Sequence, residues 1–262
     1  MRMLTIDWDF FFPDTAPFDW GHDESRGFFL EQIWWMRPGQ RDVLGKLGTA
    51  LDVVKPDPLH EGFCLGLARP SYLVVAESHA DAFHALQSMG ARRAEVWNLD
   101  AHHDLGYGED EGRDDPDPGK VDCGNWAAMA IRAGMVSSYN LVYPAWRAKS
   151  PERESPADLR GKARGARLAV RRSMDGVPAR FDAIFLCRSG CWTPTWHDDA
   201  WLGLVGGARA LGAGREVILP YALKARRPDE GEAAKAARDW EDVVRRTRTM
   251  TMGVIPSSAL GG

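Results

Sequence analysis

Asp100, His102 and Asp104 stand at alternate positions in the stretch WNLDAHHDLG, which covers residues 97–106. In an extended strand, alternate side chains point to the same side, so these three would share one face. Two carboxylates and an imidazole crowded together favour a positive charge between them. A divalent metal ion accepts these ligand types, so the stretch predicts metal binding.

Two more segments place ligand-type side chains at the end of an apolar run. The run MLTI leads into Asp7 and Asp9, and the run YLVVA shortly precedes His79. Such runs favour buried strands, and ligands bind at the carboxyl ends of parallel strands. We therefore expect six side chains to meet at one edge of a sheet: Asp7, Asp9, His79, Asp100, His102 and Asp104.

Four carboxylates and two imidazoles are more ligands than one ion needs. They suit a pair of divalent ions about 3.5–4 Å apart. Because most of the ligand atoms are hard oxygens, the set favours Mn²⁺ or Fe²⁺ over a structural zinc ion.

The expected elements around these motifs predict an α/β fold with a mainly parallel sheet, because strands alternate with helices. Strands are expected at 3–6, 72–76, 95–99, 140–143, 181–187 and 217–219, and helices at 25–36, 40–51, 80–89 and 230–247. No internal repeat or domain boundary is visible, so we expect a single domain over residues 1–262.

Two charged stretches interrupt this pattern, an acidic loop at 108–119 and a basic insertion at about 147–172. Both are typical of solvated surface loops or helices. The acidic loop is also a candidate rim that attracts a cationic substrate.

Composition narrows the class of protein. The net charge of −4 gives no reason to expect nucleic acid as a partner. The sequence contains no run of about 18 apolar residues, so we expect no membrane span. A carboxylate at position 7 interrupts any signal peptide, and the four cysteines form no CxxC pair. We therefore expect a cytoplasmic protein with free thiols. The oligomeric state is left open.

These motifs resemble those of the arginase and agmatinase (ureohydrolase) superfamily. DAHHD resembles its Asp-Ala-His-x-Asp metal motif, IDWDFFFP resembles its Asp-x-Asp motif, and VVAESHADAF resembles the strand, loop and histidine that complete the cluster. Together with CGNW, they look most similar to the branch that contains bacterial peptide arginases.

The resemblance implies a three-layer arginase-like fold with the metal site at the carboxyl ends of the strands. It also implies two Mn²⁺ ions, with Fe²⁺ or another divalent ion as a substitute. The implied reaction is hydrolysis of the guanidino group of arginine side chains in a ribosomally made precursor peptide, giving ornithine and urea. By the same resemblance, Asp7 and Asp100 bridge the ions, and the remaining ligands divide into two pairs, His79 with Asp104 and His102 with Asp9.

This chain departs from ordinary arginases in two ways. Their Asp-x-Asp motif comes late, whereas Asp7 and Asp9 come first here, so the motif order is permuted. They also carry a His-Gly after the main motif, where this chain has CGNW at 123–126. The proton-transfer residue and the acid that holds the guanidinium are therefore unassigned.

Candidates for these roles follow from side-chain chemistry. Glu77 is a candidate to hold the guanidinium or to orient His79, and Asn125 is a candidate to hydrogen-bond the substrate. Proton transfer has three candidates, of which we favour the first: His22, His103 and His197.

Arg188 is a candidate to bind a substrate carbonyl or carboxylate. In the stretch SGCWTPTWHDDAW, three tryptophans could form an aromatic wall along a peptide, and we favour Trp192 for substrate binding.

Three other functions stay open. A free arginase or agmatinase differs only in its substrate. A haloacid-dehalogenase-like phosphohydrolase would explain an Asp-x-Asp after the first strand, but Phe11 stands where that family has a threonine, and DAHHD is left without a role. A non-catalytic metal-binding protein is favoured if the cluster is fully closed.

Overall fold

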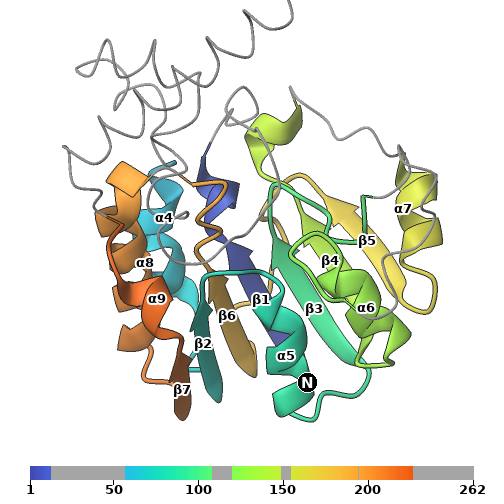
Figure 1. Ribbon diagram of the computed structural model, residues 1–262, viewed down its shortest axis with the longest axis horizontal. Helices are drawn as coiled ribbons and strands as arrows, with labels where there is room; N and C mark the ends of the chain where they lie inside the picture. The colour runs from blue at the N-terminus through green and yellow to red at the C-terminus, as the bar shows by residue number, and fades with distance from the viewer. Residues whose placement is uncertain (13–56, 108–119, 149–154, 194, 227–262) are drawn as a thin grey trace, which may run out of the picture.

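The computed structural model describes residues 1–12, 57–107, 120–148, 155–193 and 195–226 (Figure 1). In these residues, seven strands form one parallel sheet in the order β5-β4-β3-β1-β6-β2-β7. The strands are β1 (Arg2–Asp7), β2 (Tyr72–Ala76), β3 (Ala94–Leu99), β4 (Val136–Val142), β5 (Arg167–Arg171), β6 (Ala183–Cys187) and β7 (Arg215–Ile218). The predicted α/β class with a mainly parallel sheet is confirmed.

Helices cover both faces of this sheet (Figure 1). One core includes residues of α5 (Asp81–Ser88), α6 (Trp126–Arg132) and α7 (Pro156–Lys162). The other includes residues of α8 (Asp198–Ala210), the short helix α9 (Pro220–Leu223) and the 3₁₀ turns η1 (Trp8–Phe11) and η3 (Phe63–Gly66), beside α4 (Leu59–Gly62).

The central strands are apolar on both sides because each side faces one of these cores. In β1, Met3 lies in one core and Leu4 in the other. In β6, Phe185 and Leu186 divide in the same way. Side chains alternate between the faces of a strand, so a strand covered on both faces has a continuous apolar sequence.

The strand predictions agree closely with the structure in the middle of the sheet. The strand predicted at 72–76 has the same bounds, and the one at 95–99 begins one residue earlier, at Ala94. The helix predicted at 80–89 is α5. The helices predicted at 25–36, 40–51 and 230–247 lie outside the described residues.

The basic stretch at 147–172 needs a correction. It is not only a solvated surface segment, because it contains α7 and then β5, which pairs with β4 through five residues. Leu159 on α7 is buried, and β5 forms an edge of the sheet. The arginines of β5 hide its strand character, because an edge strand is exposed along much of its length.

The sheet order places β1 between β3 and β6, and β6 separates β1 from β2. The loops after β1, β3, β6 and β2 therefore meet over the centre of the sheet. Among the helices in the described part of the chain, none has the length and apolar character needed to cross a membrane.

Candidate metal centre

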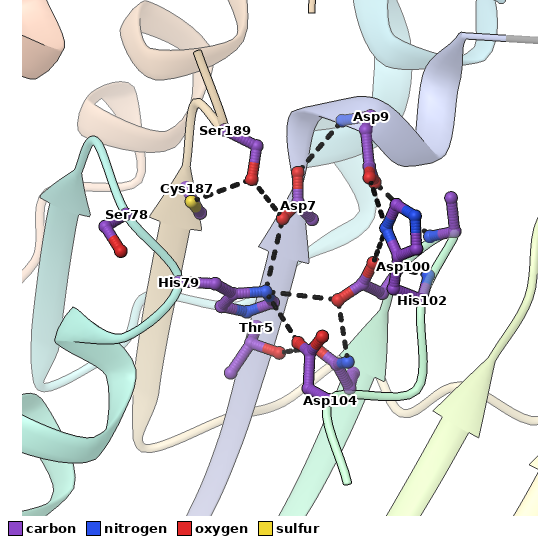
Figure 2. Close-up of polar contacts among 12 residues, drawn as sticks. Thr5, Asp7, Asp9, Ser78, His79, Asp100, His102, Asp104, Cys187 and Ser189 are labelled. Carbon is purple, nitrogen blue, oxygen red and sulfur yellow. Dashed lines mark hydrogen bonds and ion pairs between the residues drawn. The ribbon is translucent and has the colours of Figure 1, made fainter. Parts of the chain in front are cut away.

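All six predicted ligand side chains converge at the carboxyl ends of the central strands (Figure 2). Asp7 ends β1 and is the N-cap residue of the η1 turn. Its Oδ1 accepts a hydrogen bond of 3.0 Å from the backbone N–H of Asp9. This turn points the two carboxylates into the same site. His79 comes from the loop after β2, and its ring stacks on Phe185 of β6 at 5.8 Å between centroids. The imidazole thus lies over the strand that separates β2 from β1.

His79 is surrounded by three carboxylates, and we call these four residues the His79 group. Its Nδ1 lies 3.2 Å from Asp7 Oδ2, 3.1 Å from Asp100 Oδ2 and 3.0 Å from Asp104 Oδ2. Asp7, His79 and Asp100 can each offer a ligand atom within 4.8 Å of the others. Asp104 joins the group through its contact with the imidazole.

His102 forms a second set with Asp9 and Asp100, the His102 group. Its Nδ1 lies 2.8 Å from Asp9 Oδ2 and 3.6 Å from Asp100 Oδ1. Asp100 therefore belongs to both groups and directs a different oxygen toward each histidine, as Figure 2 shows. A carboxylate in this position can bridge two cations.

The expected alternation of Asp100, His102 and Asp104 along a strand was wrong, although the six side chains do meet at the strand ends as predicted. β3 ends at Leu99, so Asp100, His102 and Asp104 do not alternate along a strand. They lie in a turn, where the backbone N–H of His102 donates to Asp100 Oδ1 at 2.7 Å. Asp104 has a left-handed backbone, with φ of 55°. This conformation is uncommon for a residue other than glycine and is found where the surroundings enforce it.

The donor set fits a divalent metal. The side chains of Asp7, His79, Asp100 and Asp104 are 5% exposed or less. Both ring nitrogens of His79 and Oδ2 of Asp9 are buried and, among the described residues, make no hydrogen bond of normal geometry. Buried carboxylates need compensating positive charge, and cations supply it.

The electrostatics of the cluster also favour added positive charge. Burial, followed by the charges of Asp9 and Asp100, raises the pKa of Asp7 to about 7. Burial opposes the charged form of His79, but Asp104 and the neighbouring carboxylates raise its pKa well above the ordinary value. Both groups hold a proton more tightly than usual, as expected where carboxylates crowd together.

Hydrogen bonds from neighbouring residues orient two of the candidate ligands, Asp100 and Asp7. Asn98 Nδ2 donates to Asp100 Oδ2 at 3.1 Å, and Thr5 Oγ1 donates to Asn98 Oδ1. Ser189, two residues beyond the end of β6, donates from Oγ to Asp7 Oδ2. Sequence reasoning missed these three residues. Ser189 follows an apolar run, as the predicted ligands do, and Asn98 and Thr5 lie inside predicted strands without a local signal.

Glu77 and Arg188 form a buried ion pair beside the cluster. Arg188 donates from Nε to Glu77 Oε2 at 2.7 Å, and its Nη atoms bind Asp198 and the carbonyls of Tyr221 and Lys224. Arg188 is only 2% exposed. These contacts argue against its predicted binding of substrate. The Glu77 carboxylate binds Arg188 instead of orienting His79, while Oε1 makes no hydrogen bond within the described residues.

Asn125 is buried and braces a loop, so its predicted contact with substrate is not supported by its position. Its Oδ1 accepts from the backbone N–H of Asp122 at 2.9 Å, and its Nδ2 donates to the carbonyl of Lys120 at 3.1 Å. The neighbouring Trp126 reaches the cluster instead and donates from Nε1 to Asp104 Oδ2.

The tryptophan predictions divide. Trp192 is half-buried, and its ring lies 4.9 Å from the ring of His102. Trp201 is fully buried in α8 and donates to the carbonyl of Ala222, so it belongs to the core and not to an aromatic wall. The side chain of Trp196 lies outside what the structure describes.

The histidine candidates divide as well. His103 is buried and stacks on Tyr107 at 4.0 Å, and its Nδ1 accepts from the backbone N–H of Leu105. The ring centroid of His197 lies 5.7 Å from that of Phe12. His22 and the acidic loop at 108–119 lie outside the described residues, so their predicted roles stay predictions.

In comparisons with known proteins, no family model, no curated protein and no solved structure matches this chain. The basis for a proposed function is therefore the chemistry of the cluster together with the sequence motifs.

Proposed function

We propose that this protein is a dinuclear metal-dependent hydrolase of arginase-like fold that acts on the guanidino group of arginine side chains in a peptide. The observation that carries the proposal is the position of Asp100, whose two carboxylate oxygens face two different histidines. This supports a pair of ions sharing one carboxylate. The ureohydrolase-like motifs supply the proposed reaction class, with Mn²⁺ as the proposed metal.

The His79 group would hold one ion, and the His102 group would hold the other. When bound, a pair of divalent ions supplies Lewis acidity and lowers the pKa of water enough to provide a nucleophile near neutral pH. The net reaction adds water to the guanidino carbon Cζ and breaks its bond to Nε of the side chain. It releases urea and leaves the ornithine amine.

Substrate would approach from the side of His102. The His102 side chain is 25% exposed, whereas that of His79 is 1% exposed, so the cluster is closed on one side and open on the other. The open side argues against a purely structural metal site, since structural sites are closed. Trp192 flanks His102, and an aromatic ring there can stack on a guanidinium.

The motifs support a peptide substrate over free arginine, because they look most similar to the branch that contains bacterial peptide arginases. Arg188, which was predicted to bind a substrate carbonyl or carboxylate, favours neither substrate, because its donors bind the protein.

The test is urea release by the full chain loaded with Mn²⁺ and offered an arginine-containing peptide, free arginine or agmatine. We expect urea from the peptide, together with a mass loss equal to one cyanamide unit at arginine. The Asp100→Asn variant is the control and should release none. Urea from free arginine or agmatine alone would establish an ordinary ureohydrolase. The absence of urea from all three substrates, with ions bound, would refute guanidino hydrolysis.

A further inference from the structure

Asp104 is held by α6 at both its backbone and its side chain. Its carbonyl accepts from the backbone N–H groups of Ala127 and Ala128 at 3.2 and 3.4 Å. Its Oδ2 accepts from Nε1 of Trp126 at 2.6 Å. These contacts explain how the left-handed conformation of Asp104 is maintained, because the first turn of α6 fixes the residue at two separate points.

Trp126 also contacts His79, the histidine that Asp104 faces. Its ring lies 4.9 Å from the ring of His79, and it is fully buried in the core beneath the cluster. Packing therefore fixes the position of the indole N–H, which has no freedom to follow a moving carboxylate. The indole contacts two of the three residues that belong only to the His79 group, Asp104 and His79.

The His102 group has no equivalent contact from Trp126 within the described residues. Its specific members are His102 and Asp9, and the ring beside His102 is the half-buried Trp192. The two groups therefore differ in how firmly their ligands are held. One is braced from the core, and the other lies on the open side.

We propose that Trp126 is a positioning residue that sets the affinity of the His79 group for its metal ion. The inference depends on the proposed metal centre but not on guanidino hydrolysis. A neutral N–H donor on Oδ2 orients the carboxylate without neutralising its charge, so the oxygen remains a good ligand. Hydrogen-bonding partners of metal ligands typically change metal affinity by about 10- to 100-fold when they are removed.

The main variant is Trp126→Phe, which keeps an aromatic ring in the core and removes the N–H donor. The matched control is Trp201→Phe, because Trp201 is equally buried and its Nε1 donates at 2.7 Å to the carbonyl of Ala222, away from the cluster. Both variants lose one buried indole hydrogen bond. Only the first loses a bond to a predicted ligand.

The measurement is Mn²⁺ affinity of the full chain by calorimetric titration against a competing chelator. Wild type should bind two ions. Trp126→Phe should bind one of them about 10- to 100-fold more weakly, and Trp201→Phe should bind both as wild type does. Equal ion affinities in Trp126→Phe and wild type would overturn the proposal. An equal loss in the two variants would also overturn it, because general destabilisation would then be the cause.

A double-mutant cycle with Asp104→Asn tests whether the indole acts through Asp104. Asp104→Asn should bind only the ion of the His102 group. Adding Trp126→Phe to it should leave the affinity for this remaining ion unchanged, and a further loss would contradict the proposed route. Trp126→Tyr, which keeps a ring and a hydroxyl donor, is a second variant in case the phenylalanine variant does not fold, and it should show a smaller loss.

The outcomes also separate this proposal from the function. A wild-type protein that binds no ion would refute the metal centre and the role of Trp126 together. A wild-type protein that binds two ions but releases no urea would refute only guanidino hydrolysis, and the Trp126 comparison would still stand.

Discussion

Replacing Asp100 with asparagine should remove more metal-dependent stability than replacing any other ligand. Asp100 is the only one of the six that faces both His79 and His102 among the described residues, at 3.1 and 3.6 Å. Of these two histidines, Asp9 contacts only His102 and Asp104 contacts only His79 within the described residues. The geometry therefore predicts loss of both ions from Asp100→Asn and loss of one ion from Asp9→Asn or Asp104→Asn.

The magnitude follows from binding linkage. An ion present at 100 times its dissociation constant stabilises the folded state by about 2.7 kcal/mol. Two independent ions should then add about 5 kcal/mol to the free energy of unfolding of the wild type. The increment should be about half as large for Asp9→Asn or Asp104→Asn, and close to zero for Asp100→Asn.

The assay is denaturant unfolding of each variant, first with a chelator and then with Mn²⁺. Each variant is compared with its own chelated baseline, so that loss of a buried charge pair is not mistaken for loss of an ion. Elemental analysis of the loaded proteins gives an independent count of ions. If Asp100→Asn kept two ions and the wild-type increment, the shared-carboxylate reasoning would be wrong.

Three further predictions follow from neighbouring contacts. Ser189→Gly should weaken Mn²⁺ binding by about 10- to 100-fold in calorimetric titration, because the substitution removes the hydroxyl that donates to Asp7. Glycine accommodates the φ of 48° at this position, so the backbone need not change. Ser173→Ala, which removes the exposed hydrogen bond to Asp175, should not weaken it. Asp7 should make the chelated protein less stable as pH rises from about 4 to 7. Burial and the charges of Asp9 and Asp100 raise its pKa to about 7, so the folded state keeps a proton that the unfolded chain has released. The difference in unfolding free energy between wild type and Asp7→Asn should therefore shift against wild type over this range, and a shift in its favour would contradict the argument. Trp192→Ala should raise KM for an arginine peptide by about 2- to 30-fold, the range of a cation–π contact, and an unchanged KM would exclude stacking on the substrate.

The parts of the fold that sequence reasoning predicted are those where the local pattern and the burial coincide. β2 and β3 lie inside the sheet, so nearly all of their residues are buried and their bounds are readable from the sequence. β5 was missed because it lies at an edge, where arginines and partly exposed residues replace the apolar run. α6 was also not predicted, because its short sequence WAAMAIR is apolar on nearly all sides and shows no amphipathic period.

The meeting of the six candidate ligands was predictable for a similar reason, but their supporting contacts were not. Carboxylates and histidines directly after buried strands have few structural roles, so Asp7 and Asp100 could be identified from their positions alone. The contact of Trp126 with Asp104 joins residues 22 apart, and that of Ser189 with Asp7 joins residues 182 apart. Such pairs depend on sheet order and on the path of a loop, which a single sequence does not specify.

The sheet order also explains how motifs that are far apart in the chain can build one cluster. A strand-end site requires only that the right strands be neighbours in space, and β1 lies between β3 and β6 although it comes first in the chain. The Asp-x-Asp motif at the end of β1 therefore faces the DAHHD motif after β3 directly, through their parallel register of Ile6 with Leu99. His79 comes from the loop after β2, and β6 lies between β2 and β1. This loop is held to the segment after β6 by the hydrogen bond from the Ser189 backbone N–H to the carbonyl of Glu77 at 3.0 Å. Because Ser189 also binds Asp7, the loop after β6 connects the ligand that arrives from β2 with the ligand at the end of β1. The position of His79 in the cluster thus depends on β6, a strand from which none of the six predicted ligands comes.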